Sequence, residues 1–324
     1  MNIRSISIFV LVIVFFNSAY SQINQSEELG QVRWMRDYQK AISLAKKDKK
    51  DVLILFQEVP GCATCRNYGH NVLSHPLMVE AIENLFIPLA IFNNKGGKDR
   101  EILMLYDEPT WNNPVVRIIN GHGENVVQRI SNDYSALTLC RRMKEALIQR
   151  NVQIPEYFKL LEQELASMQT NSVSEKYYKM YCFWSGEKQL GNIDGVLDTE
   201  AGFYKFNEVV KVTFDNDVLD ENELNEYADS FNYRPVEVSE QSYKVAANDV
   251  HYYLQRSAYR FLPLTEIQQT KINSALGNHQ NPDSYLSPKQ REWLKIIKQS
   301  DGQNTPVSNM EFFEAWHLMN SKEK

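Results

Sequence analysis

Two cysteines separated by two residues, Cys62 and Cys65, are the residues of this sequence whose types and spacing best suit chemistry. Cysteines at this spacing can close a disulfide, and a thiolate at a helix N-terminus is stabilised by unpaired N–H groups and the helix dipole. An apolar run of strand length, residues 51–56, precedes them. We therefore predict a strand-to-helix turn in which Cys62 is the attacking thiol and Cys65 the resolving thiol.

Half of a metal site and a structural disulfide are alternative interpretations of this pair. Tetrahedral zinc would need a second Cys-x-x-Cys or a nearby Cys/His pair, and His70 and His75 have poor spacing for it. We therefore predict a redox dithiol and no metal. Cys140 stands among leucines of a predicted helix, and we expect it to be buried and inert.

The fourth cysteine, Cys182, is followed at once by Phe183 and Trp184, and no cysteine comes after it. A lone cysteine among aromatic residues is usually a core residue, and this interpretation stays open. If Cys182 is instead a nucleophile that becomes oxidised, a thiol from elsewhere must reduce it again.

The first residues of the chain are typical of a secretory signal. Arg4 supplies a positive start, residues 8–16 form an apolar run too short to span a bilayer comfortably, and small residues stand at 19 and 21. We predict a signal peptide over 1–21 and an exported, periplasmic or secreted protein with no stable membrane insertion after cleavage. A retained membrane anchor is the alternative. The net charge of −6 argues against a nucleic-acid partner.

The length of 324 residues predicts about two domains. In the first, the spacing of Trp34, Tyr38, Ala41, Ile42 and Ala45 predicts a helix. Buried strands are expected over 51–56 and 87–92, with a helix between them. Residues 113–130 predict a strand, a Gly-rich turn and a second strand, and 133–150 a closing helix.

This order of elements, with Cys-x-x-Cys directly after the first buried strand, resembles the thioredoxin fold over roughly residues 27–150. The stretch "VPGCATC" resembles a thioredoxin-like subgroup with Val-Pro-Gly before the reactive cysteine, and it departs from the common Trp-Cys-Gly-Pro-Cys form. The resemblance implies an α/β domain. It also implies a cis-proline beside the dithiol at Pro114.

The second half of the chain predicts an α+β domain. Residues 154–176 begin helical and end polar, and strands are expected over 195–203 and 207–215 with a helix after them. We predict the following organisation: signal peptide 1–21, first domain 22–150, helical linker 151–175, second domain 176–300 and tail 301–324.

Several ordered residues of this half resemble the A-type peptide methionine sulfoxide reductases. They are Cys182-Phe183-Trp184, Glu187, Gly195-Val196, Ala201-Gly202-Phe203, Glu208, Asn248-Asp249, Arg256-Ser257 and Pro263-Leu264-Thr265. The sequence departs from that family in three places. Tyr181 replaces a glycine, a tyrosine-bearing segment before Glu208 is missing, and Gln255 stands where the family has a second pocket tyrosine.

The resemblance implies a role for each matched residue. Cys182 attacks the sulfoxide sulfur, Phe183 and Trp184 form an apolar wall for the substrate methyl group, and Glu208 protonates the departing oxygen. Asp249 and a tyrosine, Tyr252 or Tyr253, orient that oxygen. Cys182 becomes a sulfenic acid.

Together, the two resemblances predict an exported reductase of (S)-methionine sulfoxide in proteins or peptides. Cys182 would act on the sulfoxide, and the fused dithiol would regenerate it. This reaction needs no cofactor beyond a thiol reductant, and it needs an upstream thiol–disulfide electron donor. One alternative is a general thiol–disulfide oxidoreductase with a degenerate, substrate-gripping second domain. Another is a non-enzymatic binding protein.

Overall fold

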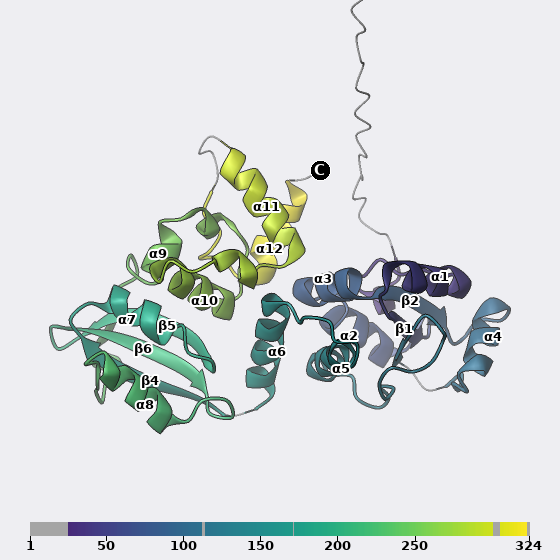
Figure 1. Ribbon diagram of the computed structural model, residues 1–324, viewed down its shortest axis with the longest axis horizontal. Helices are drawn as coiled ribbons and strands as arrows, with labels where there is room; N and C mark the ends of the chain where they lie inside the picture. The colour runs from purple at the N-terminus through teal and green to yellow at the C-terminus, as the bar shows by residue number, and fades with distance from the viewer. Residues whose placement is uncertain (1–24, 112–113, 171, 301–304, 323–324) are drawn as a thin grey trace, which may run out of the picture.

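The computed structural model describes residues 25–111, 114–170, 172–300 and 305–322 (Figure 1). The predicted signal segment, 1–21, lies outside these residues. Among those described, no helix is long and apolar enough to cross a membrane.

The first sheet has the strand order β2-β1-β3, with β1 (Val52–Gln57) parallel to β2 (Ile87–Phe92) and antiparallel to β3 (Val115–Ile119). Every residue of β1 is buried, which explains its unbroken apolar run. One face packs against α1 (Tyr38–Asp48) and α4 (Lys98–Leu105). The other packs against α2 (Ala63–Asn71), α3 (Pro76–Leu85) and α5 (Ala136–Gln149). The α/β fold predicted for this part is thus confirmed.

Two local predictions in this part are wrong. The first helix does not include Trp34, because Asp37 caps α1 by accepting a hydrogen bond from the Lys40 N–H at 2.9 Å. The expected second strand of the hairpin is reduced to isolated bridges, in which Asn125 pairs with Ile119 and Ile130 with Val116.

A long helix, α6 (Glu156–Gln169), joins the first sheet to the rest of the molecule. It contacts α3 and α5 on one side, and α10 (Glu266–Gly277) and the short η4 helix (Pro282–Tyr285) on the other. The C-terminal helices α11 (Pro288–Gln299) and α12 (Phe312–Ser321) complete this region.

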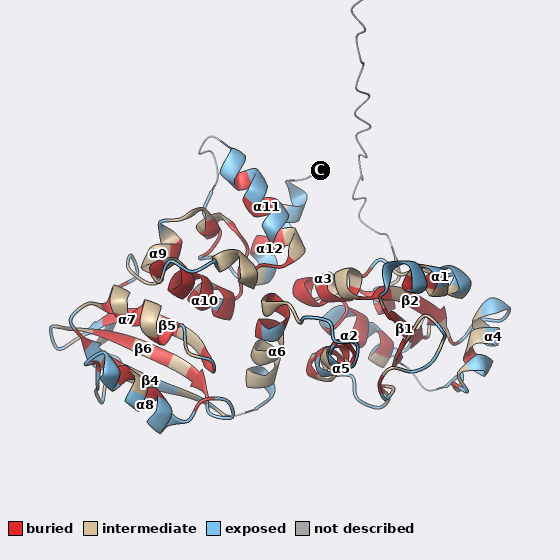
Figure 2. Ribbon diagram, in the orientation of Figure 1, coloured by how far each residue is buried: buried red, intermediate tan, exposed pale blue. Residues whose placement is uncertain are grey.

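One hydrophobic cluster runs through this region. It includes Leu53 of β1, Leu161 of α6, Leu264 before α10 and Trp293 of α11. Figure 2 shows the corresponding buried residues on α3, α6 and α10. The first sheet and the C-terminal helices therefore share one core.

The second sheet has the strand order β7-β4-β6-β5-β8 and is antiparallel throughout. Its strands are β4 (Val173–Met180), β5 (Val196–Tyr204), β6 (Asn207–Asp215), β7 (Arg234–Pro235) and β8 (Tyr243–Val245). Helices α7 (Phe183–Leu190) and α10 contact β5, and α8 (Glu221–Ser230) and the one-turn α9 (Tyr252–Gln255) complete this half. This remainder of the chain is a mixed arrangement of helices and strands.

A close approach fixes α7 against this sheet. A Cβ at Gly186 would lie 2.0 Å from the Met180 Sδ, so any larger residue there would force the Met180 side chain to move. The contact places the start of α7, and with it Cys182, at the end of β4.

Candidate functional site

Cys62 and Cys65 lie side by side at the start of α2. Cys62 is the N-cap residue and is exposed, whereas Cys65 is fully buried within the first turn. Both are free thiols, and their Sγ atoms are 3.6 Å apart. The structure thus holds a reduced dithiol of which only the first sulfur reaches the surface.

The surroundings separate the acidities of the two thiols. A hydrogen bond from the backbone N–H of Cys65 lowers the pKa of Cys62. Burial raises the pKa of Cys65 to about 11. Thiolate therefore forms first on the exposed sulfur, which is the one that a disulfide of another molecule can reach.

Polar side chains that the sequence analysis did not single out hold the loop before α2. The Gln57 Nε2 donates to the carbonyl oxygens of Glu28 at 2.6 Å and Cys65 at 3.1 Å. The Glu28 carboxylate accepts from the Gly61 N–H at 2.7 Å. Gln57 could have been noticed in the sequence, because it is a polar residue that ends an otherwise apolar strand. Glu28 could not, because its segment meets the loop before α2 only in the folded structure.

The structure describes the burial of Pro114 but not the peptide bond that precedes it. Pro114 is buried directly before β3, but the peptide bond before it involves Asn113, which lies outside the described residues. Within the described ranges, the bond between Val59 and Pro60 is cis.

One group of potential metal ligands is present among the described residues. Ligand atoms of Glu58, Cys62 and Cys65 all lie within 4.8 Å of one another. Structural zinc sites use four protein ligands, and this group offers three, two of which form the dithiol. The arrangement suits thiol chemistry better than a structural metal.

A second cluster surrounds Cys182, the half-buried N-cap residue of α7. Met180 pairs with Glu208 across β4 and β6, and this register brings the Glu208 carboxylate to the start of α7. Its Oε2 accepts a hydrogen bond from the Phe183 N–H at 2.8 Å. The structure therefore places a carboxylate against the residue that follows Cys182.

Trp184 joins further predicted residues to this cluster. Its Nε1 donates to the Asp249 Oδ1 at 3.0 Å, and its ring stacks on Tyr252 at 4.0 Å between centroids. Tyr253 lies next to Tyr252, and after burial the nearby Cys182 is the next cause that raises the pKa of the Tyr253 hydroxyl.

Tyr233 is a further tyrosine of this cluster. Burial and, after it, the nearby Cys182 raise the pKa of Tyr233 to about 12. Tyr233 follows α8 in the chain and comes near Cys182 only because β7 pairs with β4. No sequence motif marks it.

Two further residues of the Cys182 stretch differ sharply in burial. Glu187 is fully buried and accepts from the His251 N–H at 3.1 Å, and burial raises the pKa of Glu187 to about 7. Tyr181 is 98% exposed. Nothing in the structure explains why a tyrosine stands there.

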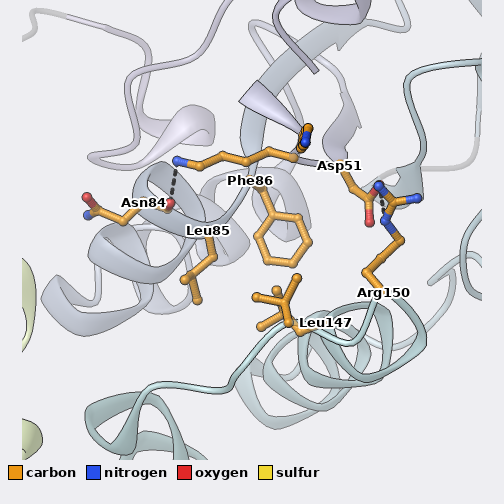
Figure 3. A pocket seen from close by; sticks show the side chains of 9 residues that line it. Asp51, Asn84, Leu85, Phe86, Leu147 and Arg150 are labelled. Atoms are coloured by element: carbon orange, nitrogen blue, oxygen red, sulfur yellow. Dashed lines mark hydrogen bonds and ion pairs between the residues drawn. The ribbon is translucent and has the colours of Figure 1, made fainter. Parts of the chain in front are cut away.

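A small hollow lies at the other end of β1 (Figure 3). Leu85, Phe86 and Leu147 form its apolar floor. Two of its three cations have partners: the Lys50 Nζ donates to the Asn84 carbonyl oxygen at 2.5 Å, and the Arg150 Nε lies 3.5 Å from the Asp51 carboxylate. Asp51 precedes β1 whereas the dithiol follows it, so the hollow is separate from the dithiol.

The two cysteine clusters lie on opposite sides of α6. Figure 1 shows α7 at the left of the molecule and α2 on the right, with α6 between them. The structure brings the predicted residues together within each cluster, but it does not bring Cys182 to the dithiol of its own chain.

Comparison with known proteins supports the identity of the first cluster. A family model described as thioredoxin-like matches residues 33–121. A solved structure described as a DsbH oxidoreductase is similar at a TM-score of 0.32 with 16% identity, covering 36% of this chain and 85% of that chain. No curated protein matches. The family model alone identifies residues 33–121, which contain Cys62 and Cys65, as a thioredoxin-like domain.

Proposed function

We propose that this protein is a thiol–disulfide oxidoreductase that works through Cys62 and Cys65. The observation that carries the proposal is an exposed Sγ at the start of α2, 3.6 Å from a buried Sγ, within a thioredoxin-like domain. The Cys62 thiolate attacks a disulfide of a partner and forms a mixed disulfide. Cys65 then attacks Cys62, closes the intramolecular disulfide and releases the reduced partner.

Reduction of a model disulfide such as insulin, with dithiothreitol as electron source, tests this function. Cys62→Ser should abolish the protein-dependent rate, and Cys65→Ser should accumulate the mixed disulfide. Cys140→Ser is the matched control, because Cys140 is fully buried and its pKa is raised by that burial. Full activity in Cys62→Ser would contradict the proposal.

Methionine sulfoxide reduction is a second candidate function, and it concerns the Cys182 cluster. The contact of the Glu208 carboxylate with the Phe183 N–H favours it, because an acid beside the nucleophile is what the departing oxygen needs. Cys182 would attack the sulfoxide sulfur against the apolar wall of Phe183 and Trp184. Glu208 would supply a proton, and methionine would leave.

Asp249, Tyr252 and Tyr253 are proposed to position the sulfoxide oxygen at this second site. Sulfoxide turnover with dithiothreitol tests the reaction, with Cys182→Ser as the inactive variant and Glu208→Gln as the variant with slowed protonation. If Cys182→Ser keeps the wild-type rate, the second function fails. A substrate-gripping or binding role for this half of the protein then replaces it.

Both functions would use no cofactor beyond a thiol reductant, and the oxidised Cys62–Cys65 pair requires an upstream thiol–disulfide donor. We infer an exported location from the sequence of residues 1–21, with oxidised proteins or peptides as partners. Detection of a mature chain that begins at Gln22 outside the cytoplasm would test the export.

A further inference from the structure

The position of Cys182 at the end of β4 bears on how it can be reduced. β4 begins at Val173, shortly after α6 ends at Gln169, and runs for eight residues before Cys182. At roughly 3.3 Å per residue, the strand carries the chain about 25 Å away from the end of α6. Cys182 is therefore remote from the C-terminal end of α6.

The dithiol lies on the other side of the same helix. α2 belongs to the layer of helices on the first sheet, and α6 contacts α3 and α5 of that layer. Figure 1 shows α6 between α2 and α7. A disulfide needs its two Cα atoms within about 7 Å, so Cys62 and Cys182 of one chain cannot join in this arrangement.

Buried hydrogen bonds fix α10 to the second sheet region. The Lys271 Nζ donates to the carbonyl oxygens of Gly191 at 3.0 Å and Ile193 at 2.6 Å, and the Ser274 Oγ donates to the Lys188 carbonyl oxygen at 2.6 Å. α10 is thus attached to the end of α7, whose first residues form the Cys182 cluster.

The packing of α6, α10 and α11 between the two sheets forms a joint. The shared hydrophobic cluster fixes the side of this joint that faces the first sheet. Leu161 of α6 and Trp293 of α11 are almost fully buried in the core that also contains Leu53 of the first sheet. The Lys289 N–H of α11 donates to the Glu80 Oε2 of α3 at 2.8 Å. A movement of Cys182 toward the dithiol of its own chain would break this core. Cys62 is exposed and Cys182 is half-buried, so these cysteines of two separate chains can meet while the core stays intact.

We propose that the dithiol of one chain reduces Cys182 of a second copy of this chain. The inference rests on the function proposed for Cys182, in which methionine sulfoxide oxidises that thiol to a sulfenic acid. Cys62 of the second chain attacks the sulfenic sulfur; the S–S bond forms, the S–O bond breaks and water leaves. Cys65 then attacks Cys62, which closes the Cys62–Cys65 disulfide and returns Cys182 as a thiol.

Trapping the intermediate tests the connectivity. In Cys65→Ser combined with Cys140→Ser, a peptide methionine sulfoxide should produce a disulfide-linked species with the mass of two chains. Peptide mapping should identify it as Cys62 joined to Cys182, and adding Cys182→Ser should remove it. A Cys62–Cys182 disulfide within a species of one-chain mass would overturn the proposal.

Mixing two complementary variants separates this proposal from the function on which it rests. Cys182→Ser keeps the dithiol, and the double variant Cys62→Ser, Cys65→Ser keeps Cys182. Sulfoxide turnover by the double variant with dithiothreitol measures Cys182 alone, and its absence refutes the proposed function and the exchange with it. If that turnover is present, the pre-reduced Cys182→Ser chain, freed of dithiothreitol, should restore the oxidised Cys182 thiol in the other chain. Failure to restore it overturns only the exchange between chains.

Discussion

Glu80 offers a quantitative test of the joint that holds the two halves of the molecule together. It lies on α3, where its Oε2 accepts from the Lys289 N–H of α11. Burial raises the pKa of the Glu80 carboxyl to about 7. The Lys289 N–H and ammonium oppose that shift, whereas the neighbouring carboxylates of Glu83 and Glu292 add to it.

The sign of the effect follows from the direction of this shift. With a pKa of 4.5 in the unfolded chain and about 7 in the folded one, the folded protein holds the extra proton between these values. The stabilisation from protonated Glu80 is complete below about pH 4.5 and is lost as the pH rises through 7. The full loss is about 3 kcal/mol, at 1.36 kcal/mol per pKa unit.

Glu80→Gln keeps an acceptor for the Lys289 N–H and removes the titration. Urea unfolding at about pH 5.5 and about pH 8.5 should show that the wild type loses about 2 kcal/mol more than the variant between these two pH values. Glu314→Gln, an exposed carboxylate on α12, is the matched control and should lose as much as the wild type. A Glu80→Gln variant with the wild-type pH difference would refute the assignment of a buried, protonated Glu80 to the joint.

Three further substitutions test other contacts. Gln57→Leu withdraws a donor from two buried carbonyl oxygens, and urea unfolding should show a loss of about 2 kcal/mol; an unchanged midpoint would contradict the role of Gln57 in holding the loop. Gly186→Ala forces a Cβ against the Met180 Sδ and should lower the stability measured by thermal unfolding by about 1–3 kcal/mol. An unchanged stability would contradict this close contact. Tyr181→Ala should stay within about 0.5 kcal/mol, because the ring is 98% exposed; a larger loss would reveal a structural role.

The sequence predicted elements whose signal is local. The strand 87–92 and the strand 207–215 have the predicted bounds, because each is an apolar run or alternation bounded by turn residues. The predicted first helix began too early, since the helical spacing includes Trp34 although the Asp37 cap starts the helix at Tyr38. Periodicity alone cannot detect a cap that interrupts it.

The residues of the candidate site also fall into two groups, those that belong to a sequence motif and those that only the fold brings together. Cys62 with Cys65, and Cys182 with Glu208, could be identified because they belong to motifs. Tyr233 could not, because its approach to Cys182 depends on an antiparallel pairing of two residues in β7. Contacts that only the fold creates leave no pattern along the chain.

The separation of the two cysteine sites also depends on contacts that the sequence does not reveal. The sequence predicted a helical linker over 151–175, and regeneration of Cys182 by the fused dithiol would need one domain to reach the other. The structure has the helix α6 in this segment, as far as Gln169, and covers it from both sides. Burial of a linking helix depends on what packs against it, which its own residues do not specify.

Cys62 and Cys182 differ in burial. Cys62 is exposed at a helix start and backed by a buried thiol, so it can reach the sulfur of a large folded partner. Cys182 is half-buried at the start of α7, where the Glu208 carboxylate accepts from the Phe183 N–H, so it is less accessible than Cys62. A joint that fixes these sites apart leaves each open to its own partner, and the more exposed thiol of a second chain is then the one able to approach Cys182.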